Sequence, residues 1–175
     1  VVVCDGMGGG PSGKAASSTA TDVIIQTVRS GKLSDSPLTV LQQAIKMANQ
    51  ALISEIQKKP ALRGMGTTVT ALLINEYSAI AAYVGDSRIY QFRRGHKKFR
   101  TFDHSMVFEM VRNGTINEEQ ARLSEQSNMI TKALGANSDI EADIVELPYE
   151  KGDRFMLCTD GIWGMFPERK LIDIV

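Results

Sequence analysis

The chain has 175 residues, 43% of them hydrophobic, and its 20 basic residues balance its 20 acidic ones. This length suits one domain with its own core, and without net charge or a long basic run, a nucleic-acid or anionic-membrane surface is excluded. The apolar runs are well short of the roughly 18 residues of a membrane span. Cys4 and Cys158 each lie in an apolar run, which is typical of reduced, buried thiols. The composition therefore predicts a cytoplasmic globular domain.

The first third of the chain predicts one strand and two helices. An apolar strand at 1–4 runs into a glycine-rich loop at 5–13, and a helix is expected at 14–30. A second helix is expected at 37–59, because its apolar residues recur at steps of three and four. These residues are Leu38, Leu41, Ile45, Ala48, Leu52 and Ile56.

From residue 67 the apolar period changes to that of strands. Short apolar or alternating runs lie at 68–74, 79–84, 88–92 and 98–102, separated by short polar turns. Such short connections predict antiparallel hairpins, because a parallel crossover needs about a dozen residues or more. A polar helical region at 105–126, strands at 140–147 and 154–159 and a helix start near 167 complete the chain. The fold class predicted is α+β, with helices covering antiparallel sheet.

Three of the predicted strands end in an aspartate beside a glycine, at Asp5-Gly6, Gly85-Asp86 and Asp160-Gly161. A carboxylate at the end of a buried strand is costly without a positive partner. If the three strands are neighbours, the carboxylates form an oxygen cluster suited to Mg²⁺ or Mn²⁺. With only two histidines and two separated cysteines, zinc is a poor candidate. The alternative interpretation is that each aspartate only forms a turn.

The glycine loop allows a second interpretation. Residues 8–14 match G-x-x-x-x-G-K between a strand and a helix, the setting of a phosphate-binding P-loop, and 155–160 is an apolar run ending in aspartate. However, Ala15 stands where that motif needs a hydroxyl for the metal. The hairpins also conflict with the parallel sheet of P-loop folds. The P-loop is therefore the minor alternative.

A series of short motifs follows one another along the whole chain. They are Asp5-Gly6-Met7-Gly8-Gly9, Gly66-Thr67-Thr68, Val84-Gly85-Asp86-Ser87-Arg88-Ile89-Tyr90, Asp103-His104-Ser105, Thr131-Lys132-Ala133-Leu134-Gly135, Gly152-Asp153-Arg154 and Leu157-Cys158-Thr159-Asp160-Gly161. In this order they resemble the motifs of the metal-dependent protein phosphatases, the PPM or type 2C serine/threonine family, in its bacterial form. The resemblance covers essentially all 175 residues.

The resemblance implies a fold and a metal site. The fold would be an αββα four-layer sandwich of two antiparallel sheets flanked by helices. Two metal ions, Mn²⁺ or Mg²⁺, would share a bridging water. Asp5 would bridge both ions, the carbonyl of Gly6 would bind one of them, and Asp160 would hold the first. Asp160 and Asp86 would form a third, weaker site, and Asp5 and Asp160 would be the catalytic residues.

The function that the resemblance implies is hydrolysis of phosphoserine and phosphothreonine in proteins by the metal-bridging water. Such ions lower the pKa of water and neutralise the phosphoryl oxygens. No phosphoenzyme is needed, which agrees with the absence of a convincing nucleophile beside a base. The expected partners are phosphoproteins and a cognate serine/threonine kinase, and the protein is expected to be a monomer. The alternative is a non-catalytic domain that binds phosphoproteins or serves as a regulatory scaffold.

Some family features are absent from the sequence. The family uses an acidic residue with an arginine upstream of Asp5 and a late Asp-Asn pair, and neither occurs here. We therefore expect residues 1–175 to form a single phosphatase-like domain whose N-terminal strand and C-terminal end lie outside them, with a mobile flap at 105–128. Position 10 is glycine where bacterial members often have histidine, so leaving-group protonation is assigned to metal-bound water. His104 is expected in a structural turn and Trp163 as a core anchor.

Overall fold

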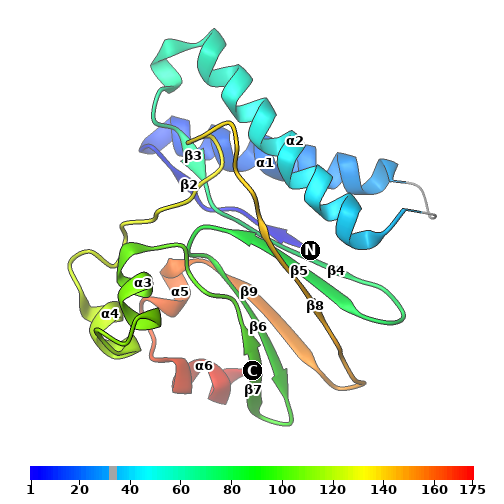
Figure 1. Cartoon of the computed structure of the whole chain (residues 1–175), viewed down its shortest axis with the longest axis vertical. Helices are drawn as coiled ribbons and strands as arrows, with labels where there is room; N and C mark the ends of the chain where they lie inside the picture. Colours follow the sequence, from blue (N-terminus) through cyan, green and yellow to red (C-terminus); the bar gives the residue numbers. More distant parts are fainter. Residues whose placement is uncertain (32–34) are drawn as a thin grey trace.

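Two long helices form the first layer of the protein. The computed structural model describes residues 1–31 and 35–175. Helices α1 (Gly10–Ser30) and α2 (Pro37–Lys58) lie side by side across one face of a sheet (Figure 1). The residues that they bury recur at helical spacing and are mostly small or aliphatic, which allows close packing. They include Ala16, Ala20 and Ile24 of α1 and Leu41, Ile45 and Leu52 of α2.

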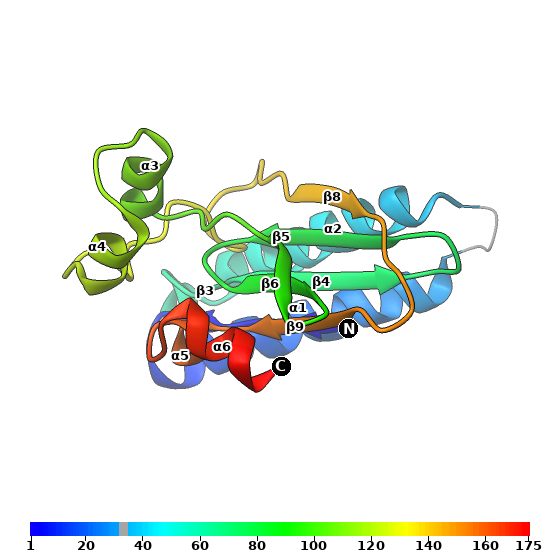
Figure 2. The same ribbon diagram turned by 90° about the horizontal axis from the view of Figure 1, so that it is seen from below.

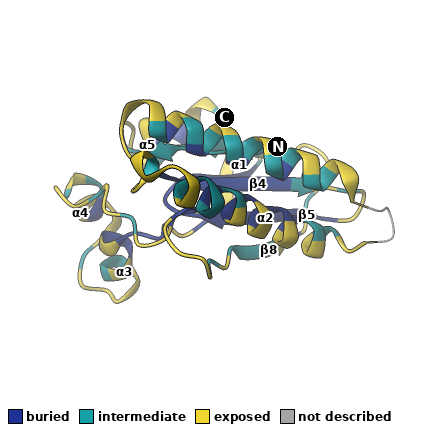
Figure 3. Cartoon of the chain, turned by 90° about the horizontal axis from the view of Figure 1, so that it is seen from above, coloured by how far each residue is buried: buried dark blue, intermediate teal, exposed yellow. Residues whose placement is uncertain are grey.

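The second layer is a four-stranded sheet in which every neighbouring pair is antiparallel. Its order is β1 (Val2–Val3), β4 (Val69–Ile74), β5 (Ala79–Val84) and β8 (Asp143–Leu147). Figure 3 shows β4 and β5 as the deeply buried centre of the molecule. Alternation along β5 explains this burial, because Ile80 and Ala82 face the helices while Ala79 and Ala81 pack in the other core.

The third layer is a three-stranded antiparallel sheet. Its order is β7 (His96–Arg100), β6 (Arg88–Arg93) and β9 (Arg154–Cys158). Ile89 packs against the first sheet, whereas its neighbour Tyr90 faces the outer helices. The short helices α5 (Asp160–Trp163) and α6 (Glu168–Ile174) cover this outer face, and Figure 2 shows them in front of the sheet with α1 and α2 behind.

The layers therefore form the αββα sandwich, and the α+β fold class is confirmed. The remaining elements lie at one end: a two-stranded ladder of β2 (Gly6–Met7) and β3 (Gly66–Thr67), and the helices α3 (Met106–Arg112) and α4 (Glu118–Leu123). A 3₁₀ turn spans Pro60–Leu62. Antiparallel pairing throughout the described sheets is incompatible with the P-loop alternative. Within residues 1–31 and 35–175, no helix is both long and apolar enough to cross a membrane.

The boundaries differ from the sequence predictions at the ends of elements. Helix α1 begins at Gly10 rather than at 14, because Pro11 suits the first turn of a helix even in a glycine-rich segment. The helical region predicted at 105–126, with Gly114 as a break, divides into α3 and α4 on either side of Gly114 as expected, and the φ of Gly114 is +73°. Helix α5 was not predicted, because its four residues carry no periodic pattern.

Candidate metal centre

Asp5 lies at the corner between β1 and β2, and its backbone is fixed by two threonines. The Thr68 N–H donates to the Asp5 carbonyl (2.9 Å), and Thr67 Oγ1 donates to the same oxygen (2.9 Å). In return, the Asp5 N–H donates to Thr68 Oγ1 (3.0 Å). That oxygen also lies 2.7 Å from Ser87 Oγ, next to Asp86 in the chain. Thr67 and Thr68 thus hold the main chain of Asp5 against the segment that carries Asp86. Neither threonine forms one of these hydrogen bonds with the Asp5 carboxyl group.

The glycine after Asp5 is required by a close approach of two backbones. A Cβ on Gly6 would lie 1.9 Å from the carbonyl oxygen of Gly13, in the first turn of α1. No side chain can fit there without displacing the backbone of the helix. The sequence Asp5-Gly6 therefore brings the first turn of α1 against the segment that carries the carboxylate.

Asp86 and Asp160 are brought to the same end of the second sheet by the register of β6 and β9. Arg88 pairs with Cys158 in this antiparallel ladder. Asp86 precedes Arg88 by two residues and Asp160 follows Cys158 by two, so both lie just beyond the paired end. Asp160 is also the first residue of α5.

The carboxyl group of Asp5 lies in an acidic environment beside Asp160. Burial raises the pKa of Asp5, and the charge of Asp160 and a hydrogen bond shared with it raise this pKa further. A hydrogen bond from Thr159 acts in the opposite direction. The pair is thus a like-charge contact whose ionised form is unfavourable without a cation.

Asp86 is more deeply buried than Asp5, and its environment is also acidic. Burial, followed by the charges of Asp160, Asp103 and Asp5, raises the pKa of Asp86 to about 7. Gly85 precedes it with a φ of +102°, and a Cβ there would lie 2.7 Å from the Thr68 side chain. Glycine is therefore needed to turn the chain at this point.

The sequence predicts that the three aspartates come together if their strands are neighbours. In the structure the strands are not neighbours in a sheet, and the aspartates approach one another because the ends of strands from two sheets lie at the same end of the sandwich. Strands β1 and β5 flank β4 in one sheet, and β9 belongs to the other sheet. Asp160 raises the pKa of Asp5 through its charge and a hydrogen bond, and the charges of both carboxylates raise the pKa of Asp86. Among residues 1–31 and 35–175, no three His, Cys, Asp or Glu side chains lie close enough to hold an ion by themselves. The carboxylates thus form a pair with a third group nearby.

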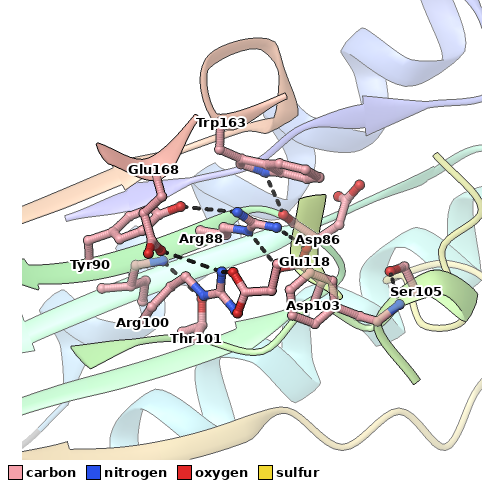
Figure 4. Close-up of polar contacts among 12 residues, drawn as sticks. Asp86, Arg88, Tyr90, Arg100, Thr101, Asp103, Ser105, Glu118, Trp163 and Glu168 are labelled. Carbon is pink, nitrogen blue, oxygen red and sulfur yellow. Dashed lines mark hydrogen bonds and ion pairs between the residues drawn. The ribbon is translucent and has the colours of Figure 1, made fainter. Parts of the chain in front are cut away.

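Arg88, Trp163 and His104 lie near these aspartates, and no pattern in the sequence assigns them a binding role. Arg88 forms a buried, two-pronged ion pair with Asp103, with Nε–Oδ1 2.8 Å and Nη2–Oδ2 2.6 Å (Figure 4). Trp163 donates its indole N–H to the carbonyl of Asp86 (2.9 Å). The Gly85 N–H donates to His104 Nδ1 (3.0 Å). Only the position of each residue beside an aspartate motif could have indicated such contacts.

Divalent cations that prefer oxygen suit this donor set. None of the ion pairs formed by the described residues involves Asp5, Asp86 or Asp160. Arg88, a buried cation two residues after Asp86 in the chain, is paired with Asp103. Uncompensated carboxylates and the absence of sulfur or imidazole ligands among them favour Mg²⁺ or Mn²⁺ over zinc. One end of the αββα sandwich therefore carries carboxylates whose chemistry suits such a cation.

Comparisons with known proteins identify the family. A family model described as protein phosphatase 2C matches residues 1–175. The chain belongs to the protein phosphatase 2C family. It is 32% identical over 178 residues to the serine/threonine phosphatase stp of Listeria innocua, and the match covers all of this chain and 71% of that protein.

Solved structures agree with this assignment. The Mycobacterium tuberculosis serine/threonine phosphatase PstP/Ppp superposes with a TM-score of 0.90 at 29% identity, covering 98% of this chain and 72% of that one. A structure of the catalytic domain of PstP in complex with two manganese ions superposes with a TM-score of 0.86 at 29% identity, covering 98% and 71%.

Proposed function

We infer that the protein is a metal-dependent phosphoprotein phosphatase that hydrolyses phosphoserine and phosphothreonine. The observation that carries this inference is the uncompensated contact between Asp5 and Asp160 at one end of a protein phosphatase 2C fold. Relatives named as serine/threonine phosphatases match the chain over its whole length. No described feature favours the alternative of a non-catalytic phosphoprotein-binding domain.

Within this proposal the candidate ligands have separate roles. Asp5 would contact two metal ions, the Gly6 carbonyl would bind one of them, and Asp160 would hold the first. Asp86 and Asp160 would together hold a third, weaker ion. The manganese-bound relative supports the choice of Mn²⁺ or Mg²⁺ and a pair of ions. The coupling of Asp86 to Asp160 and Asp5 supports its inclusion in the same centre.

The two cysteines are poor candidates for a covalent intermediate in this reaction. Bound divalent ions supply a lowered pKa for water and neutralise charge on the phosphoryl oxygens. Burial raises the pKa of Cys4, and burial raises the pKa of Cys158 to about 11, so both thiols are protonated near neutral pH and are poor nucleophiles. Direct attack of water on the phosphoryl group, beside Asp5, Asp86 and Asp160, is the route consistent with these unreactive thiols.

The partners and location follow from the same proposal. Phosphorylated serine and threonine proteins are the substrates, and a serine/threonine kinase that forms those phosphoresidues is the expected counterpart. The two cysteines are free, which supports a cytoplasmic location. We propose that the protein acts as a monomer and that residues 105–128 form a flap beside the centre, where α3 and α4 project from the sandwich (Figure 1).

A metal-dependent assay tests the proposed function. The chain, expressed with any sequence that its gene encodes on either side, is incubated with a phosphothreonine peptide and Mn²⁺, and released phosphate is measured. We expect activity that EDTA removes and that Asp5→Ala and Asp160→Ala each reduce to the EDTA level. The matched control is Asp22→Ala, an exposed carboxylate on α1, which is expected to retain wild-type activity.

The result separates the two candidate functions. Phosphate release that requires metal and both aspartates supports the phosphatase. A folded protein that binds the phosphopeptide but releases no phosphate with Mn²⁺ or Mg²⁺ contradicts it and supports the binding alternative.

A further inference from the structure

Trp163 connects the segments that carry Asp160 and Asp86. It is the only tryptophan among the 175 residues, and it follows Asp160 by three positions in α5. Its indole N–H donates to the main-chain carbonyl of Asp86 at 2.9 Å, in a buried setting (Figure 4). The ladder between β6 and β9 ends at Arg88 and Cys158. Beyond that end, this bond joins the two segments again.

The indole ring has a fixed orientation because Arg88 lies against its face. The Arg88 guanidinium carbon is 3.7 Å from a ring centroid of Trp163. Asp103 holds the same guanidinium with two hydrogen bonds, and the hydroxyl of Tyr90 lies 3.1 Å from Nη1. All three of these side chains are buried. The N–H of Trp163 therefore has little freedom to move away from Asp86.

His104 holds the Gly85–Asp86 turn by another pair of bonds. The His104 N–H donates to the Gly85 carbonyl (2.9 Å), and the Gly85 N–H donates to His104 Nδ1 (3.0 Å). The imidazole also stacks on Tyr83, with ring centroids 5.3 Å apart. His104, which stacks on Tyr83 of the first sheet, thus holds the turn, and Trp163 joins the turn to α5.

We propose that Trp163 is a positioning residue that sets the separation of the Asp86 and Asp160 carboxylates and thereby the affinity of this pair for a divalent cation. The inference rests on the proposed function, because it assumes that these carboxylates bind metal. A metal site needs its ligands at fixed distances, and the groups that orient the ligands contribute to affinity. In this arrangement Trp163 acts on the site through the main chain of Asp86 and is not itself a metal ligand.

The substitution Trp163→Phe tests the bond itself. Phenylalanine keeps an aromatic face for Arg88 and loses the N–H, leaving the Asp86 carbonyl without this donor. We expect Mn²⁺ to bind the variant about threefold to tenfold more weakly at its weakest site, the loss typical of one hydrogen bond. Electron paramagnetic resonance of free Mn²⁺ during titration measures this without any assay of activity. The Mn²⁺ concentration for half-maximal hydrolysis should rise by the same factor, with kcat at saturating Mn²⁺ unchanged.

Two further variants make the outcome decisive. Ile162→Val, a neighbour on α5 whose side chain is 44% exposed, should bind Mn²⁺ as the wild type does. Asp160→Asn should lose the binding. Mn²⁺ affinity of Trp163→Phe equal to that of the wild type would overturn the proposal, and so would a fall in kcat with unchanged affinity. If the wild type binds no Mn²⁺, the proposed function fails as well, whereas a normal wild type with an unaffected Trp163→Phe overturns this inference alone.

Discussion

Two groups of buried charges lie next to each other in this protein and have opposite character. Arg88 and Asp103 form a compensated pair, with side chains 8% and 1% exposed and two short hydrogen bonds. Burial opposes the Arg88 charge, but the hydrogen bonds and charge of Asp103 outweigh it and raise the pKa of Arg88. Two residues away, burial and the charges of Asp160, Asp103 and Asp5 raise the pKa of Asp86. Burial nevertheless raises the pKa of Asp103 above its usual value, so desolvation offsets part of the attraction between Arg88 and Asp103. The first group thus contains its own counter-charge, whereas the ionised form of the second is unfavourable without a cation.

Breaking the compensated pair is expected to have the largest effect on stability. Asp103→Asn keeps the shape of the side chain but leaves the buried Arg88 charge uncompensated, which typically costs about 3–5 kcal/mol. Urea denaturation in EDTA measures the free energy of unfolding without a contribution from metal. The double variant Arg88→Met with Asp103→Leu removes both charges and is expected to recover part of the loss. A loss below about 1 kcal/mol in Asp103→Asn would show that the pair does not stabilise the fold.

The raised pKa of Asp86 is expected to make the free energy of unfolding depend on pH. In the metal-free protein the pKa of Asp86 is raised from 3.8 to about 7. The folded state therefore keeps a proton that the unfolded state has lost, and stability falls as pH rises through this window, by on the order of 1 kcal/mol per pH unit. Asp86→Asn should flatten this part of the profile. Denaturation curves between pH 4 and pH 8 in EDTA, with Asp22→Asn as the control, measure it. Identical slopes in the wild type and Asp86→Asn would contradict the prediction.

A partly exposed ion pair gives the smallest expected effect. Arg100 is buried and makes two hydrogen bonds to Glu118 of α4 (2.9 and 3.0 Å), but the Glu118 side chain is 50% exposed. Glu168 also lies 3.5 Å from Arg100, so a second carboxylate is available to Arg100 when Glu118 is neutralised. Glu118→Gln should therefore cost less than about 1 kcal/mol in global stability. Hydrogen exchange of α4 should nevertheless be faster than in Glu119→Gln, an exposed neighbour. Equal exchange in both variants would show that this pair does not hold α4.

The sequence predicted most of the fold because its periodic patterns are strong. Strand β5 begins and ends where the alternation predicts, and α2 ends one residue short of the predicted end. The short elements β2, β3 and α5 have no such pattern, because two to four residues define no period. They are formed by pairing and packing with residues far away in the chain.

The candidate site was predicted only as a set of residues. Asp5, Asp86 and Asp160 stand out in the sequence because each follows an apolar run beside a glycine. The requirement for Gly6 was visible as a motif, but its cause is the approach of Gly13 in α1. The assignment of Asp5, Gly6, Asp86 and Asp160 to metal binding stays a proposal.

The sequence by itself determined the secondary structure of the long elements, the α+β class and the residue types suited to hard cations, because these depend on local periodicity and side-chain chemistry. Only the tertiary structure decided which groups meet. The register of β6 and β9 places Asp86 and Asp160 at one end, while Thr67 and Thr68 fix Asp5 beside them. The contact between Trp163 and the Asp86 carbonyl joins residues 77 positions apart. Such contacts follow from the packing of two sheets, which no local pattern in the sequence encodes.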